Sequence, residues 1–196
     1  MHFLIHTTEG DRSYPRDFQR GWTLLFYYEG DFLPVSATEL LGLAALAPAF
    51  GQQDCTILCL SPDRIPSHLA FLETLNRYRL AEYPAPITFP LGSDPSGTLR
   101  ERLQLAEGKK YIWLIAPDGE PKAQFCYPFE VGANFTEILR TLSALQTQKP
   151  TPCGWVPGAN TLCLPPSTRS ESCHHMTATE REGGIAIDWY LSFEGE

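Results

Sequence analysis

The sequence predicts an α/β domain followed by an extended C-terminal arm. Apolar runs of strand length alternate with segments of helical spacing, and a hairpin signature follows them. After about residue 147 the composition changes to Pro, Ser, Thr and Gly. With 196 residues, 43% of them hydrophobic, the chain is long enough to bury one ordinary core.

Two strand–helix pairs make up the first half of the predicted domain. The aromatic-rich run 22–28 (WTLLFYY) predicts a buried strand, and 37–50 predicts the helix that follows it. Residues 36–39 (SATE) fit the capping box, so Ser36 is expected to cap this helix. A second apolar strand is expected at 55–60 and a second helix at 67–80.

The second half is expected to end in a hairpin and a helix. After a short strand at 87–91 and a short helix at 98–105, residues 111–116 (YIWLIA) predict another core strand. The turn signature at 117–120 (PDGE) pairs it with a strand at 122–127.

A last helix is predicted from Asn134, which can cap it, to about Gln146. The order βα, βα, β-hairpin, α is typical of a thioredoxin-like fold. The predicted core therefore spans residues 1–148. Residues 149–196 form the arm, which contains an apolar patch at 185–193 (IAIDWYLSF).

Charge and cysteine usage exclude several functional classes. The net charge of −8 argues against a general nucleic-acid binder and against docking on anionic membranes. The longest apolar stretch, 40–50, is too short to span a bilayer, and the N-terminus has no secretory pattern. Six cysteines are too few for a disulfide scaffold of this length, so we expect a reducing, cytoplasmic location.

Seven segments occur in the same order as the motifs of one known family. They are LLFYYEGDF (24–32), VSATE (35–39), LSPDRIPSHLAF (60–71), FPLGSD (89–94), WLIAPDGE (113–120), FEVGANFTEILRTLSALQ (129–146) and GWVPG (154–158). Over roughly residues 22–162 the chain resembles the typical two-cysteine peroxiredoxins (AhpC/TSA family). The resemblance implies an α/β, thioredoxin-like fold of peroxiredoxin type, a homodimer or a ring of dimers, and no cofactor.

At the positions where that family carries its chemistry, this chain has other residues. The proline, threonine and peroxidatic cysteine of the P-x-x-x-T-x-x-C loop fall on Glu29, Leu33 and Ser36. The two arginines fall on Lys110 and Ala133, and the resolving cysteine falls on Thr151. A serine hydroxyl is a weak nucleophile near neutral pH and lacks the reactivity of sulfur towards peroxide.

We therefore expect a catalytically degenerate homologue, a pseudoenzyme without catalytic residues. It would act by binding, as a structural or regulatory subunit of a homo-oligomer or a larger assembly. The enzymatic alternative is a thiol peroxidase with a relocated cysteine. Cys153 lies two residues beyond the resolving position, and Cys126 lies in the predicted hairpin. Cys55 and Cys59 share one face of a core strand and are expected to pack there.

The arm offers two further candidate sites. Thiols and imidazoles at Cys153, Cys163, Cys173, His174 and His175 are zinc-ligand types, but none has C-x-x-C spacing and no metal is expected. The terminal apolar patch contains Trp189, Tyr190 and Phe193, and the last two loosely resemble the Tyr-Phe pair that ends the family's C-terminal arm. We expect this patch to pack against a second subunit or another protein.

Overall fold

The computed structural model describes residues 3–77, 83–168, 171, 179–181 and 183–194. The chain divides into two compact units, Met1–Thr136 and Glu137–Glu196. The boundary expected after residue 148 falls inside the second unit.

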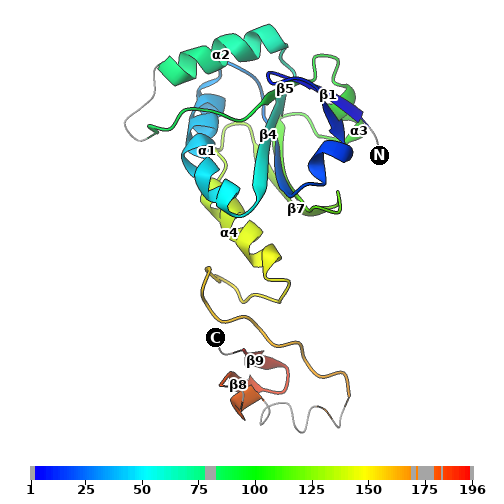
Figure 1. Ribbon diagram of the computed structural model, residues 1–196, viewed down its shortest axis with the longest axis vertical. Helices are drawn as coiled ribbons and strands as arrows, with labels where there is room; N and C mark the ends of the chain where they lie inside the picture. Colours follow the sequence, from blue (N-terminus) through cyan, green and yellow to red (C-terminus); the bar gives the residue numbers. More distant parts are fainter. Residues whose placement is uncertain (1–2, 78–82, 169–170, 172–178, 182, 195–196) are drawn as a thin grey trace. The chain divides into compact units, whose positions relative to one another are not determined.

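The first unit is built on a seven-stranded sheet with the strand order β2-β1-β5-β4-β3-β6-β7 (Figure 1). Its strands are β1 (Phe3–Thr7), β2 (Arg12–Tyr14), β3 (Trp22–Tyr27), β4 (Cys55–Ser61), β5 (Leu91–Ser93), β6 (Lys109–Ile115) and β7 (Pro121–Pro128). The helices are η1 (Arg16–Phe18), α1 (Pro34–Gln52), α2 (Ile65–Arg77), α3 (Thr98–Arg102) and α4 (Phe135–Gln146), which crosses the unit boundary. Helix α1 packs beside β4, and α2 beside β5.

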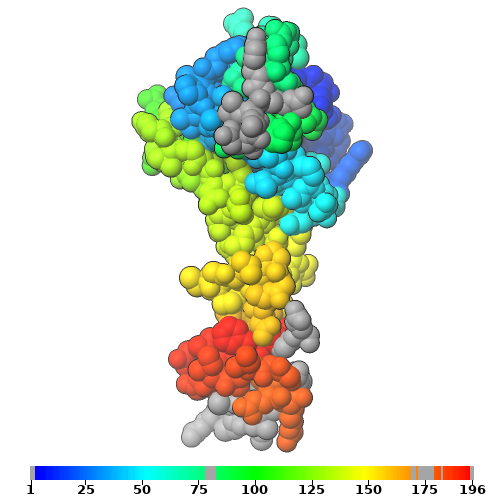
Figure 2. Space-filling view, turned by 90° about the vertical axis from the view of Figure 1, so that its left-hand side faces the viewer, coloured from blue at the N-terminus to red at the C-terminus, as the bar shows by residue number. Residues whose placement is uncertain are grey.

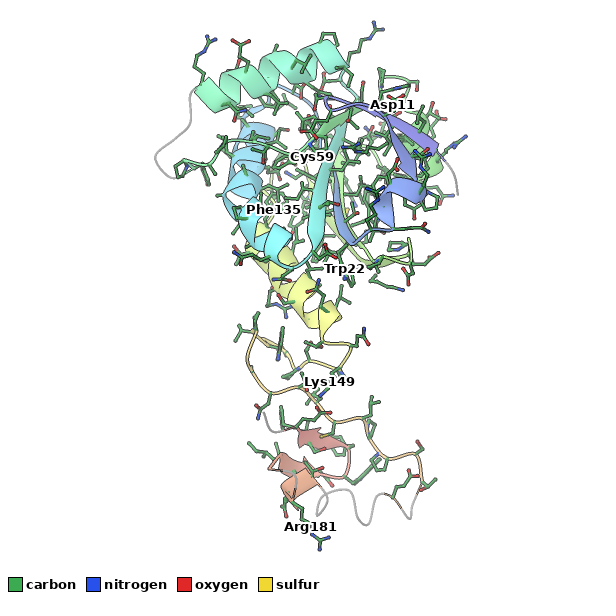
Figure 3. The ribbon with its side chains drawn as sticks, in the orientation of Figure 1. Asp11, Trp22, Cys59, Phe135, Lys149 and Arg181 are labelled. Atoms are coloured by element: carbon green, nitrogen blue, oxygen red, sulfur yellow. The ribbon has the colours of Figure 1, made fainter. Side chains whose placement is uncertain are left out.

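Continuous apolar runs form the centre of this sheet, because a strand with neighbours on both edges and both faces covered must be apolar throughout. Strand β3 runs parallel to β4, with Phe26 opposite Cys59. It runs antiparallel to β6, with Leu25 opposite Trp113. Figure 3 shows Cys59 inside the first unit, and its side chain is fully buried.

The hairpin predicted between β6 and β7 is confirmed. At the turn, the Gly119 amide donates to the Ala116 carbonyl at 2.8 Å, and the Ala116 amide donates to the Glu120 carbonyl at 3.0 Å. Gly119 has a φ of +83°, a conformation that glycine adopts at little cost.

One predicted strand differs from the structure, and three short elements were not predicted. The expected strand at 87–91 begins only at Leu91. The main-chain amide and carbonyl of Ile87 form hydrogen bonds with the Asn76 side chain instead of with a neighbouring strand. The Asn76 carbonyl oxygen accepts from the Ile87 amide at 2.8 Å. Strands β1 and β2 and helix η1 were not predicted, because short segments carry little periodic signal.

The capping role predicted for Ser36 is wrong. Helix α1 begins at Pro34, and Leu33 is the N-cap, without a side-chain cap. Proline suits the first helical position, since its fixed φ fits the helix and its missing N–H needs no partner there. Ser36 is consequently the third helical residue. By length and apolar composition α1 would also suit a membrane span, but its buried side chains are those of a core helix.

The second unit contains the C-terminal hairpin of β8 (Ile185–Asp188) and β9 (Leu191–Phe193). Leu162 bridges to Phe193, and the Cys163 amide donates to the Ser192 carbonyl at 2.9 Å. Lys149 and Glu194 form an ion pair. The first part of the arm is thus anchored to the hairpin at its end. The surface of this hairpin is coloured orange to red in Figure 2.

Candidate functional site

The segment predicted to correspond to the family's peroxidatic loop leads from the end of β3 into the first turn of α1. Glu29 and Leu33 are half-buried, and Ser36 is 2% exposed. Serine carries a hydroxyl in place of a thiol, so this position offers no thiol chemistry.

A buried ion pair lies next to this turn. The Lys110 ammonium is 2.5 Å from Glu39 Oε1, with the two side chains 1% and 2% exposed. The same oxygen accepts the Ala133 amide at 2.8 Å, whereas Oε2 has no hydrogen-bond partner among the described residues. Three segments far apart in the sequence therefore meet at one carboxylate.

Burial dominates the electrostatics of this carboxyl. Desolvation raises the pKa of Glu39, and the negative charge of Glu29 raises it further. The Lys110 ammonium and the Ala133 amide oppose this rise without cancelling it. A cavity of about 410 Å³ lies beside the pair, between α1 and residues 132–136.

A second buried hydrogen-bond network joins the residues that follow β3 to helix α2 and strand β5. His68 Nδ1 is 2.9 Å from Asp31 Oδ2, and Nε2 is 3.0 Å from the Gly92 carbonyl oxygen. The Tyr28 hydroxyl donates to Asp31 at 2.7 Å. His68 is fully buried and has hydrogen-bond partners at both ring nitrogens. These contacts give His68 a structural role in the first unit.

The cysteines fall into two chemical groups. Cys55 and Cys59 are buried, which raises the pKa of Cys55 to about 12 and that of Cys59 still more strongly. Such thiols stay protonated and react slowly. Cys126 is exposed on β7, opposite Tyr111, and Cys163 is half-buried. Cys173 lies outside the described residues.

Cys153 is an exposed thiol at the tip of a tight turn. The Trp155 amide donates to the Pro152 carbonyl at 3.1 Å across the turn. Gly154 has a φ of +72° at the third position, where a type II turn requires glycine. Trp155 is buried, and its indole N–H donates to the Ala159 carbonyl at 2.7 Å. The buried indole therefore fixes the turn that presents the thiol.

Arg140 of α4 connects this turn to the helix. Its guanidinium forms a two-point ion pair with Glu137, with both N···O distances 2.7 Å. A third nitrogen donates to the Trp155 carbonyl at 3.2 Å. The pKa of Arg140 is raised, chiefly by the hydrogen bond to Glu137 and also by its proximity to Cys153. The Cys153 thiol therefore lies on a turn that a fixed guanidinium holds through the Trp155 carbonyl.

Sequence reasoning alone did not single out Arg140. The available signal is its spacing of three residues from Glu137 on a predicted helix, which places the two side chains on one face. The approach of the 152–155 turn to this pair depends on tertiary structure and has no sequence signature.

The remaining predicted sites are only partly described. Of the zinc candidates, Cys173, His174 and His175 lie outside the described residues, and within the described part no three potential ligands cluster. At the hairpin, Trp189 is 48% exposed and Tyr190 57% exposed, and their rings meet edge to face at 5.6 Å. Phe193 is half-buried.

Comparisons with known proteins point to one family. The AhpC/TSA family matches residues 2–123. A peroxiredoxin of Methanosarcina mazei is 27% identical over 202 residues, covering 96% of this chain and 92% of its own length. A probable 1-Cys peroxiredoxin of Syntrichia ruralis is 31% identical over 180 residues, covering 84% of this chain and 79% of its own.

Solved structures confirm the predicted thioredoxin-like fold of peroxiredoxin type. A yeast mitochondrial 1-Cys peroxiredoxin matches with a TM-score of 0.85 and 24% identity, covering 100% of this chain and 96% of its own. A mutant peroxiredoxin 6 of Arenicola marina matches with a TM-score of 0.77 and 28% identity, covering 87% of this chain and 83% of its own.

These relatives overturn the main functional prediction. The prediction of a catalytically degenerate protein that acts by binding alone is contradicted, because the similar proteins are peroxiredoxins, which are thiol peroxidases. The chain also retains cysteines, Cys55 and Cys59 among them. The findings favour the alternative of a thiol peroxidase. From the family match and the relatives that cover most of its length, the chain belongs to the AhpC/TSA (peroxiredoxin) family.

Proposed function

We propose that this chain is a thiol peroxidase that reduces hydroperoxides with Cys153. The observation that carries the proposal is the exposure of this thiol on the turn whose Trp155 carbonyl accepts from the Arg140 guanidinium. A neighbouring cation stabilises a thiolate, which is the nucleophilic form of cysteine. Cys126 lies on strand β7 opposite Tyr111, and among the described residues no comparable arginine contact to its chain segment is found.

The chemistry requires only this thiol, a peroxide and a reducing thiol. The Cys153 sulfur attacks one peroxide oxygen, so that an S–O bond forms while the O–O bond breaks. Sulfur is oxidised to a sulfenic acid, and the departing oxygen takes up a proton to leave as water or an alcohol. A small external thiol then condenses with the sulfenic acid and releases water, and a second thiol restores Cys153 by disulfide exchange. A reducing cytoplasm, the location we propose, would supply these thiols.

Arg140 has two roles in this scheme. Its charge stabilises the thiolate before attack. During attack it also stabilises the negative charge that develops on the departing oxygen before that oxygen takes up a proton, which lowers the barrier to O–O cleavage. Glu137 is a positioning residue, because its two-point pair keeps the guanidinium from reaching into solvent. We propose that Glu29, Leu33, Ser36 and Lys110 maintain the structure around α1 and take no part in this reaction.

The test is rapid mixing of the fully reduced protein with one equivalent of hydrogen peroxide, followed by intact-mass analysis and peptide mapping. We expect fast peroxide loss and one added oxygen on Cys153. The Cys153→Ser variant should lose this reaction, whereas Cys126→Ser, which removes an equally exposed thiol, should retain it. Oxidation mapped to Cys126, or loss of activity in both variants, would contradict the assignment.

A second pair of variants distinguishes a catalytic effect of the Arg140 guanidinium from an effect on the fold. Arg140→Gln should slow peroxide reduction about 10- to 100-fold, the rate equivalent of one charge-assisted contact. Arg140→Lys should retain part of the rate, since the charge persists without the planar fork. Equal rates in all three proteins would exclude a role for Arg140.

We also infer that the protein is a homodimer. Peroxiredoxins typically form dimers or larger rings, and Ile185, Ile187, Trp189 and Tyr190 are all about half exposed or more on the C-terminal hairpin. Exposed apolar clusters of this kind are typical of protein interfaces.

A further inference from the structure

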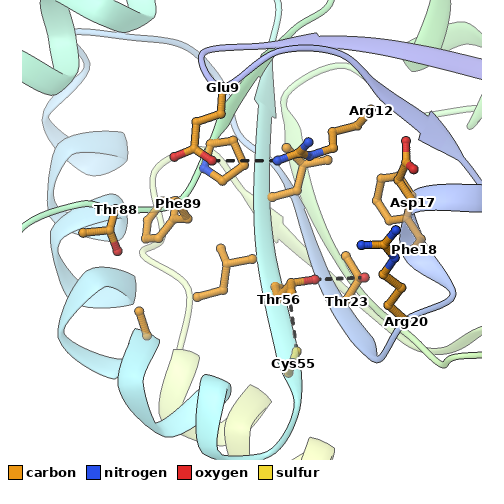
Figure 4. Close-up of a pocket in the computed structure, with 14 residues that line it drawn as sticks. Glu9, Arg12, Asp17, Phe18, Arg20, Thr23, Cys55, Thr56, Thr88 and Phe89 are labelled. Atoms are coloured by element: carbon orange, nitrogen blue, oxygen red, sulfur yellow. Dashed lines mark hydrogen bonds and ion pairs between the residues drawn. The ribbon is translucent and has the colours of Figure 1, made fainter.

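A second cavity lies at the start of strands β3 and β4, whereas Ser36 lies beyond the end of β3. Its volume is about 590 Å³, and the first residues of β3 and β4 form its base (Figure 4). Ser36 and Glu39 instead follow the end of β3. The cavity is thus separate from the peroxidatic loop, and it contains no residue of the second unit.

The inner wall of this cavity is apolar. Phe18, Ile57, Leu58 and Phe89 line it, and each is less than 10% exposed. They come from η1, β4 and the segment before β5, which are fixed by the sheet. A preformed apolar wall with a few polar groups at its rim is the usual construction of a small-molecule site.

The charged groups at the rim do not pair completely. Glu9 lies 3.8 Å from Arg12. Asp17 accepts from Arg16, which is outside the cavity, at 3.2 Å, and from the Ser13 amide at 2.7 Å. These contacts lower the pKa of Asp17, chiefly through the Arg16 hydrogen bond. Both carboxylates at the rim therefore already have cationic partners.

Arg20 is left without a partner. Within the residues that the structure describes, no hydrogen bond or ion pair reaches its guanidinium, although it lines the cavity next to Thr23. The Thr23 and Thr56 hydroxyls lie 3.3 Å apart at the base and add polar groups close to it. The unpaired positive charge of Arg20 beside an apolar wall favours a ligand that has one negative charge and an apolar remainder.

We propose that this cavity binds a small amphipathic monocarboxylate. Its carboxylate pairs with Arg20, and its hydrocarbon portion covers Phe18 and Phe89. A phosphate dianion fits less well, because its second charge would face the Glu9 and Asp17 carboxylates. A neutral or cationic ligand would leave Arg20 unpaired. The site is independent of the proposed peroxidase reaction.

Octanoate is a suitable probe in isothermal titration calorimetry with the full chain. We expect saturable binding with one site per chain. The Arg20→Gln variant should weaken it about tenfold or more, the loss of one charge-assisted contact. The matched control is Arg64→Gln, which removes another exposed arginine, at the start of α2, and should bind octanoate as the unmodified chain does.

Amide shifts in two-dimensional NMR locate the ligand. Octanoate should perturb Thr23, Thr56 and Phe89, and 1-octanol, which has the same chain without the charge, should bind at least tenfold more weakly. The proposal is overturned if octanoate does not saturate, if Arg20→Gln and Arg64→Gln bind alike, or if the shifts lie elsewhere in the chain.

Discussion

At the scale of single residues, the Glu39–Lys110 pair is a buried ion pair of the first unit. Both side chains are almost fully excluded from water, so each charge depends on the other. Lys110→Met would leave the Glu39 carboxylate buried without its cation. We expect the free energy of unfolding to fall by about 3–5 kcal/mol at neutral pH, measured by urea denaturation.

A double variant tests this explanation. Glu39→Gln combined with Lys110→Met removes both charges and keeps an oxygen that can accept the Ala133 amide. It should therefore be more stable than Lys110→Met alone. If the double variant is no more stable than the single one, the loss comes from packing rather than from an uncompensated charge.

Asp31 should make the fold sensitive to acid. Burial alone would raise its pKa, but hydrogen bonds from His68, Ser67 and Tyr28 outweigh burial and leave the pKa lowered. The folded carboxyl therefore holds its proton less tightly than the unfolded one. Its stabilising contribution is complete above the unfolded value of about 3.9 and is lost as pH falls through the lower, folded value.

The variant Asp31→Asn measures that contribution. At neutral pH it should lower the free energy of unfolding by about 1–3 kcal/mol, since His68 loses a charged partner. The difference from the unmodified protein should shrink as pH decreases below about 4. A difference that stays constant from pH 7 to the acid transition would show that the Asp31 charge is not responsible.

At the scale of elements, two glycines in regular structure should respond in opposite ways to alanine. Gly92 of β5 lies between β1 and β4, and an added Cβ would come within 2.8 Å of Ile5 Cγ2 and even closer to Leu60. Gly92→Ala should cost about 1–3 kcal/mol by overpacking. Gly51 of α1 has no atom within 4 Å of an added Cβ, so Gly51→Ala should stabilise the helix by about 0.5–1 kcal/mol.

Urea denaturation of the two variants checks both signs with one method. A stable Gly92→Ala variant would mean that β5 can move away from its neighbours. A destabilised Gly51→Ala variant would mean that the C-terminal turn of α1 needs the freedom of glycine, for which its described surroundings give no reason.

The elements also show what the sequence could predict. Strands β3, β4 and β6 were predicted to within one or two residues, because continuous burial demands an apolar run at every position. The start of α1 was misplaced because the serine of a capping box gave the stronger signal, whereas Pro34 at the first helical position decides the outcome. The candidate thiol Cys153 was visible in the sequence. The contact of the Arg140 guanidinium with the Trp155 carbonyl of the same turn was not, since it depends on how the 152–155 turn folds back on α4.

At the scale of the whole molecule, the proposed chemistry belongs to the second unit. Cys153, Arg140 and Glu137 all lie within Glu137–Glu196, whereas the peroxidatic loop of the family falls in the first unit. Ser36, at the predicted peroxidatic position, and Cys153, the proposed nucleophile, therefore belong to different units. The motif positions alone led to the wrong functional prediction, because Cys153 is not among them.

The C-terminal hairpin should determine the assembly state of the whole protein. Ile187 is 61% exposed, and Ile187→Lys would place a charge in the centre of the proposed dimer interface, where an unpaired charge opposes association. In sedimentation velocity at micromolar concentration, we expect the unmodified chain at twice its 21.9 kDa mass and the variant at the monomer mass. Leu164→Lys, which charges an exposed leucine in the same unit outside the hairpin, should remain dimeric. A monomeric unmodified chain, or a dimeric Ile187→Lys variant, would exclude the hairpin as the interface.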